Sequence, residues 1–353
     1  MKALSNLKRL QVSSDYLISL IKVYENKGKE FYYDKLFKTD EEVLKVKTSE
    51  ENTFYLGKIL NLELTDARLR LLSRRNNKPK NKDEALLVNI KSALSSIQRN
   101  PKGFEYLENE FDNLAKMLSK KYEQITFNKR EVKDNKDLFN SSKMVSKRDD
   151  LTNILNEFKI QQKTNQYELI QLVTNFLIDY LESDIFTSDN DIISLIILYA
   201  IIIKEFSVFK YIPFFELLYK SYSHYQKALN EAKYYYDTGF PNTDSLSIFL
   251  VNILSDAYNR LDRLGSQYSF EKTMNKSDSI EATILKGKEI FSKNDLRLKH
   301  PTVSVVTIDR TLARLKDEGV IRLIGKGRSA KWQKIDEKER KGIKQLDIFY
   351  FTE

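Results

Sequence analysis

The feature that most constrains the fold of this chain is the order of elements that residues 301–334 predict. The stretch reads PTVSVVTIDRTLARLKDEGVIRLIGKGRSAKWQK. Apolar residues at helical spacing run from Val305 to a stop at Glu318-Gly319, and Ser304 is a suitable N-cap because its hydroxyl can accept a backbone N–H. An apolar strand, a basic glycine-containing turn and a second strand follow. This order predicts a small α+β module.

Apolar residues upstream of this helix complete the expected core of the module. Ile284, Ile290, Phe291 and Leu296 are predicted to pack on the helix through Ile308, Leu312 and Leu315. Trp332, on the second strand, is expected to cover the same core. A helix preceded by such elements and followed by a two-stranded wing resembles the winged helix-turn-helix, a module that binds DNA.

The module carries a set of candidate DNA contacts. Polar residues at three- and four-residue spacing are predicted to face the major groove from the helix: Thr307, Arg310, Thr311 and Arg314, with Ser304 at its start. Arg310 is the best candidate for bidentate contact with a guanine, worth about 1–3 kcal/mol of discrimination. Lys326, Arg328 and Lys331 of the wing are predicted to contact phosphates. An ordinary solvated face stays open as the alternative, since many winged helices bind only proteins.

The charge of the chain is concentrated in the same region. Of the net charge of +9, residues 271–353 hold +6, from 19 basic and 13 acidic side chains. The other 270 residues carry only +3. A basic segment on a nearly neutral body is typical of a nucleic-acid-binding module attached to something else, so double-stranded DNA is the predicted partner.

The rest of the chain is predicted to be helical. Ten glycines and five prolines are few for 353 residues, and apolar residues recur at helical spacing. Residues 31–52 are mixed, and a helix is expected from Asn52 to Leu62. Thr65 is predicted to cap the next helix, because its hydroxyl can accept a free backbone N–H. A hairpin is expected near Ile125 to Val132.

The absence of cysteine excludes disulfides and thiolate metal sites and fits a cytoplasmic location. The apolar run Ile192–Ile203 is too short to span a bilayer and is interpreted as a buried helix. The two histidines, His224 and His300, are distant in sequence, so no metal site is expected.

A polar loop before that buried helix resembles a catalytic motif. Asp184 to Leu195 reads DIFTSDNDIISL, follows an amphipathic helix and precedes the apolar one. It resembles the HPFx[D/E]GNGRxxR motif of the Fic (fido) family, helical proteins that usually transfer AMP from ATP to a protein hydroxyl. Upstream, LGKILNLELTDARLRLL (Leu56 to Leu72) resembles the inhibitory helix of that family. The segment YIPFFELLYKSYSHYQKALNEAKYYYDTG resembles its later helices.

The departures from the motif concern the residues that carry the family chemistry. Phe186 and Asn190 match, but the general-base His is replaced by Asp184. The phosphate-cradling glycines are replaced by Asp189 and Asp191, and the arginines by Ile192 and Leu195. In the segment that resembles the inhibitory helix, Leu60 occupies the position of the inhibitory Glu and Leu56 occupies the position of the Ser/Thr. Carboxylates in place of glycine and arginine repel phosphate, so neither catalysis nor a bound nucleotide or other cofactor is expected.

The sequence therefore predicts a mainly α protein, with a Fic-like helical body and a small C-terminal winged-helix (α+β) domain. The expected divisions are an N-terminal helical region (1–82), a Fic-like domain (83–268) and a DNA-binding domain (275–340). The predicted function is that of a catalytically inactive transcriptional or mobile-element regulator, cytoplasmic and without membrane association. A homodimer or a protein partner would bind the body. Two alternatives stay open: a divergent AMP transferase and a protein-interaction or antidote module.

Overall fold

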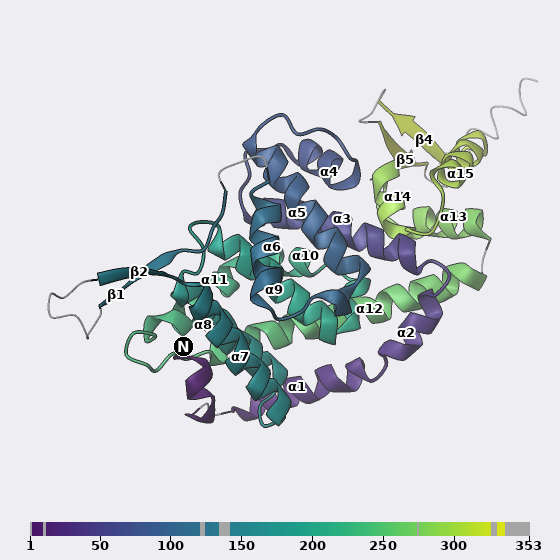
Figure 1. Ribbon diagram of the computed structural model, residues 1–353. Coiled ribbons are helices and arrows are strands. Elements are labelled where there is room, and N and C mark those ends of the chain that lie inside the picture. Colours follow the sequence, from purple (N-terminus) through teal and green to yellow (C-terminus); the bar gives the residue numbers. More distant parts are fainter. Residues whose placement is uncertain are drawn as a thin grey trace, which may run out of the picture. The chain divides into compact units, whose positions relative to one another are not determined.

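The computed structural model describes residues 2–9, 12–120, 124–133, 142–273, 275–325 and 330–335. Helices dominate this part of the chain, as the sequence predicts, and its paired strands form two small antiparallel sheets (Figure 1). The chain divides into two compact units. We call Met1–Lys35 with Lys45–Asp262 the body, and Leu36–Leu44 with Arg263–Glu353 the C-terminal unit.

The elements follow one another along the chain with short connections. The first half contains η1 (Leu4–Arg9), α1 (Ser14–Lys27), α2 (Glu30–Phe37), α3 (Glu41–Ile59), α4 (Asp66–Arg74), α5 (Lys82–Arg99), η2 (Pro101–Gly103), α6 (Glu108–Leu118), β1 (Lys129–Lys133), β2 (Ser142–Ser146) and α7 (Arg148–Thr164). The second half of the body contains α8 (Leu169–Ser183), α9 (Asn190–Glu205), η3 (Ser207–Lys210), α10 (Phe214–Lys220) and α11 (Tyr222–Tyr234). Helix α12 (Asp244–Thr273) belongs to both units.

Several boundaries differ from the sequence-based expectation. Residues 31–52 gave no clear pattern, yet they fold into α2 and most of α3, so the helix expected from Asn52 begins at Glu41. Glu41 and Glu42 favour that start because carboxylates interact well with the positive helix N-terminus. The hairpin expected near 125–132 is wider, since β1 pairs with β2 and Lys129 lies opposite Ser146. The predicted cap is confirmed, because the hydroxyl of Thr65 accepts the N–H of Arg68 at 3.3 Å.

The body is built around α9. All twelve residues from Ile192 to Ile203 are buried, which confirms the buried helix that the sequence predicts. The helix packs against α5, α6 and α8. A helix that is apolar on every side needs neighbours on every side, and that requirement places it at the centre. No helix in the described part of the chain is long and apolar enough to cross a membrane.

A buried carboxylate binds the N-terminal residues to this core through hydrogen bonds. Asp179 of α8 has no exposed surface. It accepts the backbone N–H groups of Lys2, Ala3 and Leu4 at 2.7, 3.0 and 2.9 Å, and the hydroxyl of Tyr236 at 2.9 Å. A buried charge is tolerated when hydrogen bonds replace its hydration, so this cluster holds η1 against α8.

The C-terminal unit has its own sheet and core. Its elements after α12 are α13 (Lys276–Lys286), β3 (Ile290–Ser292), α14 (Lys293–Lys299), α15 (Val305–Asp317), β4 (Ile321–Ile324) and β5 (Lys331–Lys334). The strands form an antiparallel sheet in the order β3-β5-β4. The core contains Ile280, Ile284, Phe291, Leu296, Val303, Ile308, Leu312, Leu315, Val320 and Ile321, and Trp332 packs on it. Helix α15 has the predicted bounds.

One predicted core residue of this unit lies outside the core. Ile290 is about half exposed, whereas its neighbour Phe291 is buried. Successive side chains of a strand point to opposite faces. Because Phe291 points inward from β3, Ile290 points outward, so only one of the two adjacent apolar residues fills the core.

Candidate functional sites

The loop between α8 and α9 adopts a backbone that favours glycine, although it contains none. Asp184 has φ 47° and Asp189 has φ 59°, both in the left-handed region. Aspartate enters this region more readily than most residues, at modest cost. Asp189 stands where the resembled motif has glycine. The backbone turn is therefore present, but a carboxylate accompanies it.

Asp184, which the sequence resemblance aligns with the general-base His of the Fic motif, is held in place by its neighbours. One carboxylate oxygen accepts the amide of Asn190 at 3.0 Å, and the other accepts the amide of Asn128 at 2.7 Å. The Nζ of Lys147 lies 3.8 Å from the same carboxylate and donates to the carbonyls of Ser183 and Asp184. The side chain of Asp184 therefore has a structural role, because it connects Asn128, Asn190 and Lys147.

The side-chain amide of Asn190 links the two ends of the loop by hydrogen bonds. Its Oδ1 accepts the backbone N–H of Phe186 at 3.0 Å, and its Nδ2 donates to the carbonyl of Phe186 at 2.7 Å. The structure therefore brings together all three residues that the sequence assigned to the degenerate motif: Asp184, Phe186 and Asn190. Their mutual contacts shape the loop.

The segment before β1 pairs with the loop. The N–H of Asn128 donates to the carbonyl of Ile185 at 2.8 Å, and the N–H of Thr187 donates to the carbonyl of Thr126 at 2.9 Å. The rings of Phe127 and Phe186 stack with centroids 4.9 Å apart. Backbone and side chains of residues 126–128 thus occupy one edge of the loop, an interaction that local sequence patterns did not predict.

The electrostatics of the loop are unfavourable for phosphate. Asp189 and Asp191 are exposed at the start of α9, while Ile192 and Leu195 are buried in the core where the motif would place arginines. Burial, with a contribution from the carboxylates of Asp191 and Asp184, raises the pKa of Tyr180 far above its ordinary value. A helix N-terminus attracts anions, but here the nearest side chains are acidic. The helical segment that resembles the inhibitory one has Leu56 fully buried and Asn61 in the left-handed region.

The outward face of α15 is the second candidate site. Opposite its buried residues lies a stripe of exposed side chains: Val306, Arg310, Ala313 and Asp317. The hydroxyl of Ser304 accepts the N–H of Thr307 at 3.1 Å, which confirms the predicted N-cap. Asp309 beside the stripe forms an ion pair with Lys293 of α14 at 2.5 Å. Arg310 is therefore the basic side chain at the centre of the exposed stripe.

The prediction that Thr311 faces outward from α15 is wrong. Thr311 is only 2% exposed, and its hydroxyl lies 2.9 Å from the carbonyl of Thr307 and 3.0 Å from the hydroxyl of Ser277. Helix α13 packs against this side of α15. More of the circumference of α15 is therefore buried than the sheet and α14 alone would cover. Thr307 is half-buried on the same flank.

Arg314 is partly exposed, with 40% of its side-chain surface accessible, but it has partners within the C-terminal unit. Its guanidinium forms ion pairs with Glu281 of α13 at 2.6 Å and with Glu318 at 2.9 Å. The hydrogen bonds that the guanidinium donates to these two carboxylates raise the pKa of Arg314 above its ordinary value. The side chain thus joins α15 to α13 and does not point outward beside Arg310. Val306 and Ala313 were missed, although their spacing from Ile308, Leu312 and Leu315 places them opposite the core.

The predicted wing contacts are only partly within the described residues. Lys331 opens β5 and is exposed. Lys326 and Arg328 lie outside the described residues. In the described part of the chain no group of three or more His, Cys, Asp or Glu side chains is placed to hold a metal ion.

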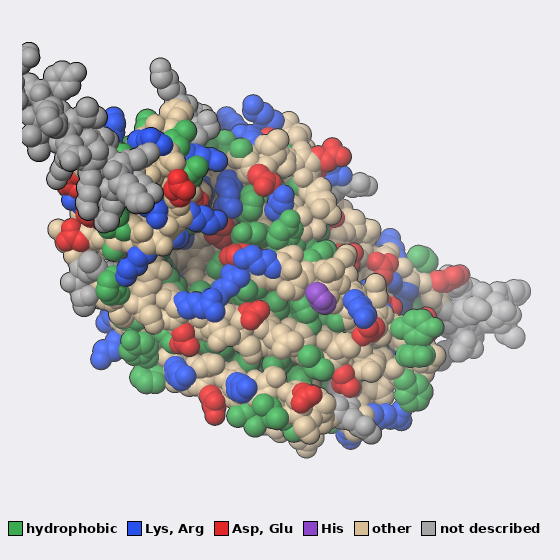
Figure 2. Space-filling model, turned by 180° about the vertical axis from the view of Figure 1, so that it is seen from behind, with side chains coloured by type: hydrophobic (Ala, Val, Ile, Leu, Met, Phe, Trp, Pro, Cys, Tyr) green, Lys and Arg blue, Asp and Glu red, His purple; other side chains and the backbone are tan. Residues whose placement is uncertain are grey.

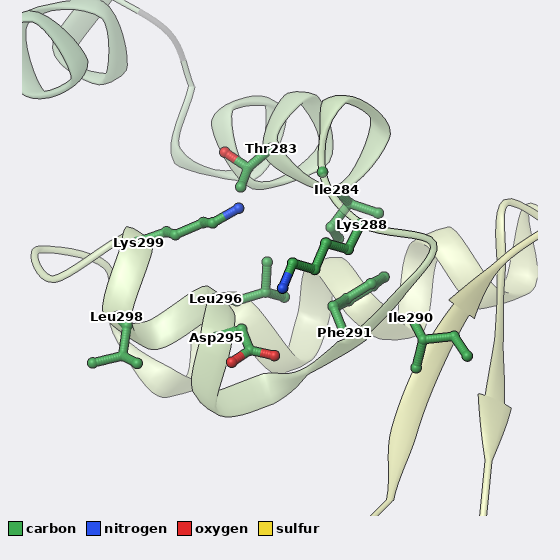
Figure 3. Close-up of a pocket in the computed structure, with 10 residues that line it drawn as sticks. Thr283, Ile284, Lys288, Ile290, Phe291, Asp295, Leu296, Leu298 and Lys299 are labelled. Atoms are coloured by element: carbon green, nitrogen blue, oxygen red, sulfur yellow. The ribbon is translucent and has the colours of Figure 1, made fainter. Parts of the chain in front are cut away.

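A small cavity lies between α13, β3 and α14. It measures about 250 Å³, and Ile284, Phe291 and Leu296 are among its apolar lining residues. Lys288 and Lys299 reach into it from opposite sides, and Asp295 lies below them (Figure 3). Asp295 also completes the capping box of α14, because its carboxylate accepts the N–H of the N-cap residue Ser292 at 2.8 Å. The mixed charge around this cavity gives no preference for one class of ligand.

Comparisons with known proteins identify the fold. No protein-family model matches the chain, and neither does any curated protein. A Fic family protein from Desulfovibrio desulfuricans G20 has a similar structure, with a TM-score of 0.53 at 10% identity over 93% of this chain and 98% of that one. A Fic domain containing signaling protein from Bacteroides thetaiotaomicron VPI-5482 aligns with a TM-score of 0.51 at 14% identity, over 71% and 96% of the two chains. The chain therefore has a Fic-like fold.

Proposed function

We propose that this protein is a DNA-binding regulator, in which a Fic-like body without nucleotide chemistry carries a winged helix-turn-helix. The single observation that carries the proposal is the outward face of α15, where Arg310 is exposed on a capped helix within the basic end of the chain. The order α13, β3, α14, α15, β4, β5 supports this interpretation, because it is the order of a winged helix. Residues 275–340 would form the DNA-binding domain.

Each part of this domain has an expected role on DNA. Arg310 would enter the major groove and contact a guanine, with Val306 and Ala313 beside it as apolar contacts for thymine methyl groups. Lys331, with Lys326 and Arg328 of the same wing, would contact phosphates and position the domain without reading sequence. Thr311 and Arg314 would support α15 from the side of α13.

The loop between α8 and α9 supports the absence of catalysis. Its carboxylates at Asp184, Asp189 and Asp191 produce a field that repels a triphosphate, and Asp184 is already hydrogen-bonded to two asparagines. Ile192 and Leu195 are buried and supply no charge-assisted bond. The body would then act as a scaffold that binds a second copy or a protein partner.

The test is DNA binding by the full chain. A bound sequence selected from a random pool is labelled, and fluorescence anisotropy is measured as salt increases. We expect the logarithm of the affinity to fall linearly with the logarithm of salt, as phosphate contacts require. Arg310→Ala should weaken specific binding by about 5- to 150-fold, the equivalent of about 1–3 kcal/mol.

The control is Arg99→Ala, which removes the same charge from an exposed position on α5 of the body. It should leave the affinity almost unchanged, and Arg314→Ala should have a smaller effect than Arg310→Ala. Absence of binding at low salt would remove the DNA proposal. Binding of ATP by calorimetry, lost in Asn190→Ala, would instead favour a divergent transferase.

A further inference from the structure

Helix α1 is hydrophobic on two sides. Tyr16, Leu20 and Val23 are buried against the body. On the outer side Leu17, Ile18 and Ile21 are 46, 53 and 58% exposed. Val12 just before the helix and Tyr24 in its last turn are also exposed, at 43 and 38%, and the hydroxyl of Tyr24 donates to Glu168 of the body at 2.9 Å. We call Val12, Leu17, Ile18, Ile21 and Tyr24 the α1 strip.

The α1 strip is unusual for the surface of a folded body. A surface helix normally has polar residues on the side away from the core. Contiguous exposed apolar surface marks an interaction site more often than isolated apolar residues do. In the reverse view (Figure 2), exposed hydrophobic side chains lie among acidic and basic ones along the lower part of the surface.

The charges beside the strip indicate what covers it. Asp15, Lys22 and Glu25 are all exposed, and none of them forms an ion pair with another described residue. Glu25 follows Ile21 by one turn at the end of the strip. Asp15 and Lys22 are seven residues apart, so they lie on the same flank of α1, about 10 Å apart along its axis. Ile18 lies between them. A partner that fits this surface needs an apolar strip, with a positive charge opposite Asp15 and a negative charge opposite Lys22.

We propose that α1 binds the α1 of a second copy of this chain, antiparallel, about a two-fold axis next to Ile18. Such an axis reverses the helix direction and keeps each side chain on its own flank, so Asp15 of each copy meets Lys22 of the other. The same operation brings Leu17 close to Ile21 and Val12 close to Tyr24. Closed two-fold dimers use one surface twice in this way.

A parallel arrangement lacks this complementarity. Equivalent residues would then lie at the same height along the two helices, so Asp15 and Lys22 would remain about 10 Å apart along the axis. The antiparallel arrangement forms two ion pairs and buries both strips. The dimer does not depend on DNA binding. Where the proposed function holds, the dimer carries two C-terminal units, so the DNA site would contain two half-sites.

The experiment is sedimentation velocity of the full chain without DNA, at increasing protein concentration. The wild type should form dimers, and Ile18→Asp should be monomeric at concentrations where the wild type is dimeric. The control Ile160→Asp places the same charge at another exposed isoleucine, on α7, and should dimerise like the wild type. Circular dichroism checks that all variants are folded.

Charge reversal tests the antiparallel geometry. Asp15→Lys alone and Lys22→Glu alone each place like charges together twice in the dimer, so each should weaken dimerisation by about 5- to 100-fold. The double variant restores both pairs and should return to within about 3-fold of the wild type. A monomeric wild type, an Ile160→Asp effect as large as that of Ile18→Asp, or a double variant no better than the single ones would each overturn the proposal.

Discussion

At the scale of single residues, buried carboxylates depend on hydrogen bonds from neighbouring side chains and backbone groups of the body. Glu84 at the start of α5 is one of them, with a side chain only 6% exposed. The Nε and Nη2 of Arg68 each donate to one of its oxygens at 2.7 Å, and the N–H of Lys80 donates at 2.8 Å. Hydrogen bonding by Arg68, chiefly, lowers the pKa of Glu84 to about 2.

The depressed pKa of Glu84 predicts a dependence of stability on pH. The unfolded chain binds the proton near the ordinary pKa of 4.5, whereas the folded chain binds it only near 2. The stabilisation is therefore present above about pH 5 and is lost as the pH falls towards 2. Urea denaturation should show the largest difference between the wild type and Glu84→Gln near neutral pH.

A difference between these two proteins that stays constant down to pH 2 would contradict this assignment. Glu63→Gln is the matched control, since it removes the same charge from an exposed side chain of the preceding segment that forms no ion pair with a described residue.

At the scale of elements, the loop between α8 and α9 depends on partners from another part of the chain. Asn190 makes its contacts within the loop, but Asn128 and Phe127 come from the segment before β1. Loops that place polar backbone near a core need such partners for their N–H and C=O groups. The shape of this loop is thus stabilised by the pairing of residues 126–128 with residues 185–187.

We expect Asn190→Ala to lower the free energy of unfolding by about 1–3 kcal/mol, because it leaves the N–H and C=O of Phe186 without their partner. Asn190→Asp should cost more, since its carboxylate would face Asp184 and the carbonyl of Phe186. Urea denaturation followed by far-UV circular dichroism measures both. Ser188→Ala, an exposed change in the same loop, should lie within about 0.5 kcal/mol of the wild type. An Asn190→Asp protein as stable as the wild type would exclude a stabilising role for the two hydrogen bonds between Asn190 and Phe186.

At the scale of the whole molecule, each of the two units has apolar core residues of its own in the described part of the chain. The body is organised around α9, and the C-terminal unit has the cluster that includes Leu312 and Leu315. The chain contains one tryptophan, Trp332, and it packs on the C-terminal cluster. Tryptophan fluorescence therefore follows one unit, while the far-UV circular dichroism signal is dominated by the larger helical body.

These two signals should separate the unfolding of the two units. Leu312→Ala leaves a cavity in the C-terminal core and should lower the free energy of unfolding of that unit by about 2–5 kcal/mol. It should therefore shift the fluorescence transition to lower urea concentration. Ile197→Ala in α9 should instead shift the circular dichroism transition. If both variants shift both transitions equally, the two units unfold as one cooperative structure.

The sequence by itself determined the features that depend on neighbours a few residues away. Helical spacing, the caps at Thr65 and Ser304, and the stop at Gly319 gave the bounds of α15 and the start of α4. The unbroken apolar run of α9 predicted its burial. Helix α2 and most of α3 were missed because their residues carry no strong apolar periodicity.

Only the tertiary structure decided which side chains of these elements are exposed. Arg310 and Arg314 are both at plausible positions in the sequence of α15, but Glu281 of α13 draws Arg314 to one flank and leaves Arg310 outward. Asp184 takes the place of the general-base His in the resembled motif, and only the structure shows that Asn128, 56 residues earlier, donates a hydrogen bond to its carboxylate. Periodicity and capping act over a few residues, whereas the faces that become covered depend on elements that folding brings together from far along the chain.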